Sequence, residues 1–272
     1  MIRTPSLRVL PLLALLLCTT SFAARYEAPP LVSAVKSNMQ VSRHFAAGLE
    51  YLLVEPRGTT ADAVLPMIVV LHGRGSRPVP PQRAYLDLDE PVRVVLPRGP
   101  LPHRSGYAWM PVSAHNGDSP ALNGPLRERV RELSDAMSEW RDRHPTRGLP
   151  IVTGFSQGGI LAATLAVTYP ESLSRAFPMA GWIPEELTPT EYDRFERHVP
   201  MHALHGADDT VIGAARTRAQ LIRLRALGYP VVYEEIEGAG HEPHPEMTER
   251  LRELIERALR ELPETPGESG LS

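Results

Sequence analysis

Short apolar runs alternate with longer amphipathic stretches along most of the chain, and this alternation predicts strands and helices in turn. Runs of four to six apolar residues have the length of buried strands, and they lie at 49–54, 67–71, 92–96, 150–153, 176–179, 201–204 and 231–236. Helical spacing of apolar residues begins near Pro125 and recurs over residues 247–262, while residues 160–167 are apolar on all sides, as in a buried helix.

This order of elements predicts the fold class. Continuous apolar strands are typical of parallel sheets that are buried on both faces. Repeated alternation of strand and helix predicts right-handed crossovers between parallel strands. We therefore expect an α/β protein with a doubly wound, mostly parallel sheet and helices on both faces. One or two antiparallel strands are expected at its N-terminal edge. In such sheets the active site lies at the carboxyl ends of the strands.

The first residues have the pattern of an export signal. Two arginines, Arg3 and Arg8, precede an apolar run at residues 9–17, and Ser21 and Ala23 supply the small side chains that a signal peptidase requires. We expect residues 1–23 to be a secretory signal peptide, which predicts a periplasmic or secreted protein.

Two alternatives to a cleaved signal remain at this point. The apolar run could stay as an uncleaved anchor, although it is too short to span a membrane comfortably. Lipid attachment at Cys18 is the other alternative, but Leu17 is large where lipid attachment requires a small residue. Residues 24–262 are expected to form a single catalytic domain. Residues 263–272, rich in Pro, Gly, Glu and Ser, are expected to form a disordered tail.

Composition excludes several classes of function. The chain has 272 residues, 42% apolar and 22% charged, which is ordinary for a globular protein. The net charge of −3 provides no basic field, so we expect no nucleic-acid partner. Because Cys18 is the only cysteine, disulfides, cysteine-ligated metals and a cysteine nucleophile are excluded from the rest of the chain. The sequence does not indicate an oligomeric state.

A candidate nucleophile lies between a predicted strand and a predicted helix. Residues 154–158 match G-x-S-x-G, with Ser156 at the centre. That motif forms a nucleophile elbow when it links a strand to a helix, because the glycines allow a strained turn to pack closely. A glycine-rich turn with an N-capping serine would look similar, but the apolar strand and helix on either side favour the elbow.

Candidate partners for Ser156 follow two later strands. A serine needs a general base, and His241 lies in a glycine-containing loop after the strand at 231–236. His244 precedes Pro245 and is expected at the start of the last helix. An acid must orient the base, and either Asp208 or Asp209, after the strand at 201–204, could do so; we favour Asp209.

A loop after an early strand is expected to complete an oxyanion hole. Residues 71–75 read Leu-His-Gly-Arg-Gly. The backbone N–H of Arg74 is the candidate donor there, and the N–H of Gln157, directly after the nucleophile, is the second. His72 is expected to brace the loop by hydrogen bonds. The order Ser156, Asp209, His241 is that of α/β-hydrolases.

These motifs together resemble the carboxylesterase/phospholipase group of α/β-hydrolases, which includes acyl-protein thioesterases and small bacterial esterases. The oxyanion loop, the elbow, the acid loop at residues 205–209 and the histidine loop at residues 238–241 stand in the order of that family, over roughly residues 67–262. The resemblance implies Asp209 as the acid and the N–H groups of Arg74 and Gln157 as oxyanion donors.

The resemblance implies an enzyme that hydrolyses carboxylic esters through an acyl-enzyme, without a metal or cofactor. A short- or medium-chain ester, a lysophospholipid or an aromatic ester would each fit as the small-molecule substrate. Trp109 and Trp182 are candidate pocket walls, with plain core packing as the alternative. A serine peptidase on the same fold, or a secreted binding protein without activity, are alternative functions. The family is mostly intracellular, so an export signal is a departure from it.

Overall fold

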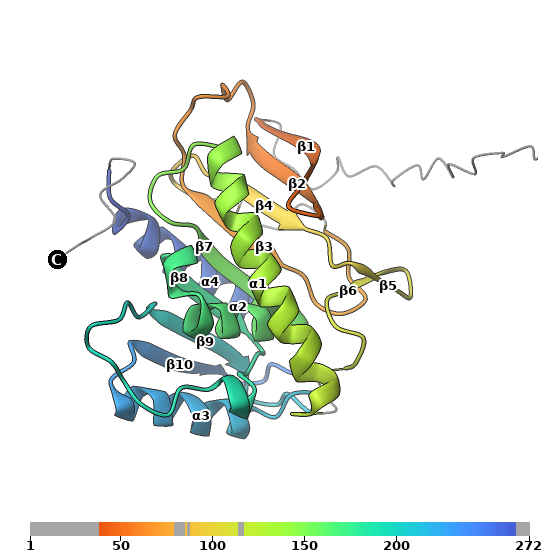
Figure 1. Cartoon of the computed structure of the whole chain (residues 1–272), viewed down its shortest axis with the longest axis vertical. Coiled ribbons are helices and arrows are strands. Elements are labelled where there is room, and N and C mark those ends of the chain that lie inside the picture. Colours follow the sequence, from red (N-terminus) through yellow and green to blue (C-terminus); the bar gives the residue numbers. More distant parts are fainter. Residues whose placement is uncertain (1–37, 79–84, 86–87, 114–116, 265–272) are drawn as a thin grey trace, which may run out of the picture. The chain divides into compact units, whose positions relative to one another are not determined.

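The computed structural model describes residues 38–78, 85, 88–113 and 117–264 of the chain (Figure 1). They fall in one of two units of the chain, Leu31–Ser272; the other unit, Met1–Pro30, lies outside the described residues. The predicted signal at residues 1–23 and most of the predicted tail therefore also lie outside them. The single catalytic domain at residues 24–262 stays a prediction.

The main sheet confirms the predicted α/β class. It has eight strands in the order β1-β2-β4-β3-β7-β8-β9-β10; the pairs β1–β2 and β2–β4 are antiparallel, and every other neighbouring pair is parallel. The strands are β1 (Met39–Ala46), β2 (Leu49–Pro56), β3 (Met67–Leu71), β4 (Arg93–Pro97), β7 (Ile151–Phe155), β8 (Arg175–Met179), β9 (Met201–Gly206) and β10 (Val231–Ile236).

Helices cover both faces of this sheet (Figure 1). One core contains side chains of α1, α2 and α3, and the other contains side chains of α4. Neighbouring residues of one strand point to opposite cores, as Leu53 and Leu52 of β2 do. The helices are α1 (Pro120–Arg143), α2 (Gln157–Thr168), α3 (Ala214–Leu227) and α4 (Pro245–Arg260), with short 3-10 turns η3 (Pro170–Ser172) and η4 (Glu185–Leu187).

The structure corrects the predicted start of the first long helix. We expected it near Pro125, but α1 begins at Pro120, and Pro125 lies inside it. Pro120 at the first helical position costs no hydrogen bond, because a backbone N–H at that position would have no acceptor within the helix. Pro125 removes one backbone hydrogen bond, and burial of Leu122 in the extra turn offsets this loss.

The sequence analysis gave no residue range for strand β1, although it expected one or two antiparallel strands at this edge, and it did not predict helix α3 or the small hairpin of β5 (Leu101–His103) and β6 (Gly106–Ala108). Helix α3 hides its periodicity because its buried face includes the polar residues Thr217 and Gln220. The hairpin strands are only three residues long, too short for a recognisable alternation.

Parallel pairing positions the site. Strands β3, β7, β8, β9 and β10 run in the same direction, so their carboxyl ends meet at one edge of the sheet. The loops after β3, β7, β9 and β10 carry every residue for which the sequence predicts a catalytic role. Among the described residues, no helix combines the length and the apolar character that crossing a membrane requires.

Candidate active site

Ser156 occupies a strained turn between β7 and α2. Its backbone has φ 56° and ψ −115°, outside the regions that non-glycine residues prefer. Hydrogen bonds on both sides hold it there, from Ser156 N–H to Met179 O (3.0 Å) and from Ile160 N–H to Ser156 O (2.9 Å). Such strain costs about 1–3 kcal/mol and is typical of functional turns. The local geometry is therefore that of a nucleophile elbow.

Glycine is required next to this turn because other backbone segments lie against it. A Cβ atom at Gly158 would lie 2.0 Å from the carbonyl oxygen of Leu71, at the end of β3. Two non-bonded atoms cannot lie this close, so one of the two backbone segments would have to move. The glycine thus brings the start of α2 against the strand that leads into the predicted oxyanion loop.

Three predicted site residues form one hydrogen-bonded row. The Ser156 hydroxyl donates to Nε2 of His241 at 2.9 Å, and Nδ1–H of His241 donates to Oδ2 of Asp209 at 2.7 Å. The Asp209 side chain is fully buried, and that of His241 is 17% exposed. The His241 ring also packs on the ring of Phe155, with 5.0 Å between centroids. This arrangement can move a proton from the serine hydroxyl to the imidazole.

The structure separates the two aspartates that the sequence left open. Oδ1 of Asp209 accepts the backbone N–H groups of Val211 and Ile212, each at 2.8 Å, while its other oxygen faces His241. Asp208 is exposed. Asp209 is therefore the aspartate that contacts the histidine. His244, the other nearby histidine, caps the N-terminus of α4, as the sequence predicted.

The acid loop and the histidine loop are joined by their backbones. Ala207 N–H donates to Ile236 O (3.0 Å), and Asp208 N–H donates to Ala239 O (2.9 Å). A Cβ at Gly206 would lie 2.4 Å from the carbonyl oxygens of both Ala239 and Gly240. Only glycine allows the two loops to approach this closely, and their approach sets the distance between Asp209 and His241.

The loop after β3 forms a tight turn against Ser156. Gly73 O accepts Ser76 N–H at 3.2 Å, and Gly75 has φ 80°, which a type II turn requires at its third position. A Cβ at Gly73 would lie 3.6 Å from Cβ of Ser156. Within the described residues, the backbone N–H groups of Arg74 and Gln157 have no acceptor. Both candidate oxyanion donors are therefore available to a ligand atom.

His72 braces this turn. Its Nε2 accepts Gly99 N–H at 3.0 Å, so Nδ1 carries the hydrogen that it donates to Gly73 O at 2.8 Å. Burial lowers the pKa of His72, which keeps the ring neutral and suits this tautomer. The Trp109 indole N–H adds a bond to His72 O at 2.9 Å. The ring therefore bridges the loop to the segment after β4.

The side chain of Gln157 has a role that the sequence analysis did not identify. Its Oε1 accepts Trp109 N–H at 3.0 Å, and its Nε2 donates to Met110 O (3.2 Å) and Val112 O (2.9 Å). The whole residue is buried. The sequence signal that could have indicated this role is a polar residue at the start of a helix that is otherwise apolar on all sides. Gln157 ties the segment at 109–112 to the elbow.

Trp109 and Trp182, proposed from the sequence as pocket walls, lie in the hydrophobic core instead. They are 1% and 2% exposed, so neither offers a surface to a ligand in this structure. Arg216 covers one face of the Trp182 ring, with its guanidinium carbon 3.8 Å from the ring centroid. Both rings pack under the loops of the site, as the alternative interpretation had it.

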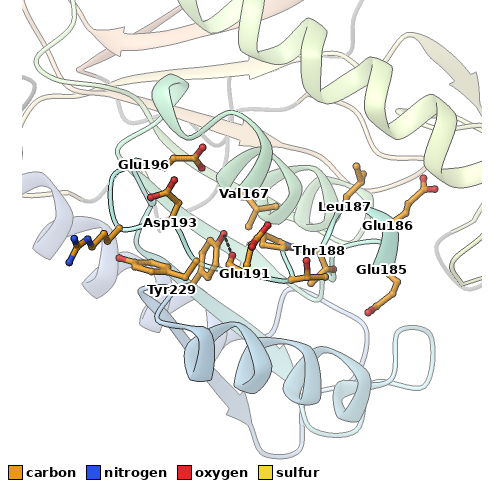
Figure 2. A pocket seen from close by; sticks show the side chains of 13 residues that line it. Val167, Glu185, Glu186, Leu187, Thr188, Glu191, Asp193, Glu196 and Tyr229 are labelled. Carbon is orange, nitrogen blue, oxygen red and sulfur yellow. Dashed lines mark hydrogen bonds between the residues drawn. The ribbon is translucent and has the colours of Figure 1, made fainter.

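A cavity of about 1110 Å³ is lined by none of the predicted site residues. Figure 2 shows side chains that line it. Its walls come from Val167 at the end of α2, from the segment between β8 and β9, and from Tyr229 after α3. Carboxylates dominate the lining: Glu185, Glu186, Glu191, Asp193 and Glu196. Glu185 and Glu186 form ion pairs with Arg223 and Arg127. The cavity is thus separate from the row of Ser156, His241 and Asp209.

Comparison with known proteins identifies the family to which this site corresponds. A family model described as phospholipase/carboxylesterase matches residues 58–259, about three quarters of the chain. Acyl-protein thioesterase 1 of Gibberella zeae is 24% identical over 115 residues, 40% of this chain and 48% of the relative. A probable carboxylesterase of Oryza sativa subsp. japonica is 29% identical over 124 residues, 44% of this chain and 47% of the relative. The chain spans about half the length of these curated relatives.

Solved structures agree on the fold. Acyl-protein thioesterase 2 of Zea mays has a TM-score of 0.59 at 22% identity, covering 77% of this chain and 98% of that one. A Bacillus cereus carboxylesterase has a TM-score of 0.61 at 18% identity, covering 77% and 94%. These likenesses establish the α/β-hydrolase fold that the sequence predicted.

Proposed function

Because the chain belongs to the phospholipase/carboxylesterase family of α/β-hydrolases, we propose that it is a serine hydrolase that cleaves a carboxylic ester through an acyl-enzyme. One observation carries this proposal. The hydroxyl of Ser156, the imidazole of His241 and the buried carboxylate of Asp209 are joined by hydrogen bonds of 2.9 and 2.7 Å. Such a row activates a serine for attack on an acyl carbon.

Acylation is the first half of the proposed reaction. Oγ of Ser156 attacks the ester carbonyl while Nε2 of His241 takes the hydroxyl proton. Asp209 holds the ring in the tautomer that leaves Nε2 free to accept, and its charge stabilises the imidazolium. The N–H groups of Arg74 and Gln157 bind the developing oxyanion. His241 then gives its proton to the leaving alkoxide, and the acyl group stays on Ser156.

Deacylation repeats these roles with water as the nucleophile. His241 takes a proton from water, and the resulting hydroxide attacks the acyl carbon. The tetrahedral oxyanion again lies at the N–H groups of Arg74 and Gln157. When it collapses, His241 returns its proton to Oγ of Ser156, and the carboxylic acid leaves. No step requires a group from outside the chain apart from the ester and water.

The proposed substrate is a small or medium acyl ester. The names of the relatives, acyl-protein thioesterase and probable carboxylesterase, support acyl transfer to water but leave the physiological ester open. A lysophospholipid or an aromatic ester is compatible with the same chemistry. An amide or peptide bond requires protonation of a poorer leaving group, which is why we rank ester cleavage first.

Hydrolysis of p-nitrophenyl esters, from acetate to palmitate, tests the proposal. We expect the native protein to turn over and Ser156→Ala to lose at least about a thousandfold in kcat/KM. Ser134→Ala is the matched control, because the hydroxyl of Ser134 in α1 bonds that of Ser172 in η3 and not a residue of the proposed site, and it should keep full activity. The acyl chain length that is hydrolysed fastest then indicates the size of the acyl-binding site.

Labelling with a fluorophosphonate distinguishes an unusual substrate from an inactive serine. Labelling that Ser156→Ala abolishes, in a protein that cleaves none of these esters, would indicate another acyl substrate, such as a peptide. Absence of both labelling and turnover would overturn the proposal in favour of a binding protein without activity.

Export of the protein is a separate proposal, supported by Arg3, Arg8 and the apolar run that follows them. Expression of the full chain in a bacterium, followed by fractionation and N-terminal sequencing, tests it. We expect a periplasmic or secreted product that begins at Ala24. A product that retains Met1 in the cytoplasm would contradict export, and a lipid-modified N-terminus at Cys18 would identify the lipoprotein alternative.

A further inference from the structure

A second buried histidine lies beside the acid of the proposed site. His205 is the second-last residue of β9, and its side chain is 1% exposed. Its Nε2 lies 2.8 Å from the carbonyl oxygen of Ile212 and 3.3 Å from Oδ2 of Asp209. A carbonyl oxygen can only accept, so Nε2 must carry the hydrogen. This N–H is therefore donated to the carbonyl of Ile212, and the carboxylate oxygen that accepts from His241 lies beside it, outside hydrogen-bonding geometry.

The other ring nitrogen of His205 makes no such contact. Within the described residues its Nδ1 is buried without a hydrogen-bond partner. The charged and titratable groups around the ring are Asp209, His241 and Glu235, and the ring of Tyr233 lies 6.2 Å away. Burial lowers the pKa of His205, so the ring is neutral. A buried nitrogen without a partner is unfavourable, so the position is not optimised for stability.

Ile212 closes a ring of contacts around the acid. Its N–H donates to Oδ1 of Asp209 at 2.8 Å, while its carbonyl accepts Nε2–H of His205. The loop between β9 and α3 is thus held through both backbone polar groups of Ile212. Oδ1 of Asp209 accepts two backbone N–H groups, and Oδ2 accepts the N–H of His241.

We propose that His205 is a positioning residue: its Nε2–H holds the carbonyl of Ile212, whose N–H binds Oδ1 of Asp209, and its ring lies against Oδ2, so that the carboxylate stays directed at Nδ1 of His241. The kinetic part of this inference rests on the proposed function. A neutral donor suits the position, because a lysine or arginine there would neutralise Asp209 and weaken its attraction for the imidazolium. An apolar side chain would leave the carbonyl of Ile212 without its donor and so loosen the loop whose N–H groups bind Oδ1 of Asp209.

Two substitutions of His205 separate the donor from the packing. His205→Met fills the space without an N–H, and His205→Gln offers an amide N–H near the position of Nε2. We expect His205→Met to lose about three- to tenfold in kcat, the range for a lost hydrogen bond between neutral groups, with KM changed less than about twofold. His205→Gln should recover most of that loss.

The pH profile gives a readout that a purely structural role would not move. Without the donor from His205, more negative charge remains on Oδ2 to stabilise the protonated form of His241. The acid limb of kcat/KM should therefore move to higher pH in His205→Met, by about half a unit or more, and stay near the native position in His205→Gln. His202→Met is the matched control: it removes a histidine of β9 that bonds Glu234 instead of Asp209, and its acid limb should not move.

Titration of His241 followed by NMR in ¹⁵N-histidine-labelled protein tests the same inference without any turnover. The titration of His241 should move upward in His205→Met and not in His202→Met. A protein that cleaves no ester yet shows this shift would overturn the proposed function and support the role of His205. Equal behaviour of His205→Met and His205→Gln, or an unmoved His241 titration in an active enzyme, would overturn the role of His205 alone.

Discussion

The tripeptide Leu-His-Gly occurs at the carboxyl ends of two strands of the same sheet, where it starts at the last residue of β3 and forms the last three residues of β9. Its side chains serve different purposes in the two places. After β3, Gly73 lets the loop lie against Ser156, and both ring nitrogens of His72 are hydrogen-bonded. After β9, Gly206 lets the acid loop lie against residues 239 and 240, and only one ring nitrogen of His205 has a partner. One tripeptide thus braces a turn in one place and contacts the proposed acid in the other.

This difference shows that surroundings decide what a motif does. His72 faces the backbone of the chain, Gly73 O and Gly99 N–H, so its bonds hold a loop in shape. His205 faces Ile212 O and the carboxylate of Asp209, so its single N–H bears on the charge of the site. We therefore expect changes around His72 to reduce stability first and changes around His205 to reduce activity first.

The largest expected effect is at the acid of the second loop. Asp209→Asn should reduce kcat by about ten-thousandfold, because an amide at this position favours the wrong tautomer of His241. Steady-state kinetics on p-nitrophenyl acetate measure the loss. Asp208→Asn, which changes an exposed neighbour, is the control and should stay within about twofold. Equal losses in both variants would contradict the assignment of Asp209.

The two glycines should respond very differently to an added methyl group. Gly206→Ala places a Cβ 2.4 Å from two carbonyl oxygens, whereas Gly73→Ala places it no closer than 3.4 Å to any neighbour. We expect Gly206→Ala to lower the free energy of unfolding by about 3 kcal/mol or more and Gly73→Ala by less than about 1 kcal/mol. Urea denaturation of both variants measures this, and equal losses would refute the comparison.

Loss of the bracing histidine should reduce stability more than activity. His72→Leu leaves the buried N–H of Gly99 without its acceptor, which costs about 1–3 kcal/mol. We expect the free energy of unfolding to fall by that amount while kcat falls less than about tenfold. His205→Met should show the opposite balance, since its Nδ1 is already without a partner. Urea denaturation and kinetics on the same preparations decide between the two patterns.

The smallest effect that we predict is a pH dependence of stability. Burial lowers the pKa of both His72 and His205 in the folded protein, whereas in the unfolded chain such rings take up a proton near pH 6.5. The unfolded state therefore binds more protons as the pH falls, and the free energy of unfolding decreases below about pH 6.5. Urea midpoints at pH 7.5, 6.5 and 5.5 should decline in that order.

A double variant sharpens this prediction. His72→Leu combined with His205→Met should show a shallower decline than the native protein over the same pH range. A native protein that is as stable at pH 5.5 as at pH 7.5 would show that these two rings are not held neutral by the fold.

Much of the fold could be predicted because its signals are local. Strand β3 has the predicted bounds, and the other central strands differ from the prediction by two residues or fewer at either end. Helix α3 escaped prediction since Thr217 and Gln220 lie on its buried face, where Gln220 bonds the backbone of Ile183. Polar residues of this kind are buried only where a distant segment satisfies them.

The sequence by itself determined which loops meet at the site. Strand ends carry Ser156, Asp209 and His241 in an order that a parallel sheet brings to one edge, and the glycines beside them allow the close approach of their loops. These features follow from local conformation and from the direction of the strands, which apolar runs and turn residues encode.

Only the tertiary structure decided what the remaining polar and aromatic groups do. It buried Trp109 and Trp182 in the core, gave Asp209 and not Asp208 to His241, and brought Gln157 to the segment at 109–112. It also turned His205 toward Asp209. The physical reason is that a hydrogen bond or a buried ring depends on partners from other loops, and one stretch of sequence does not contain the positions of those partners.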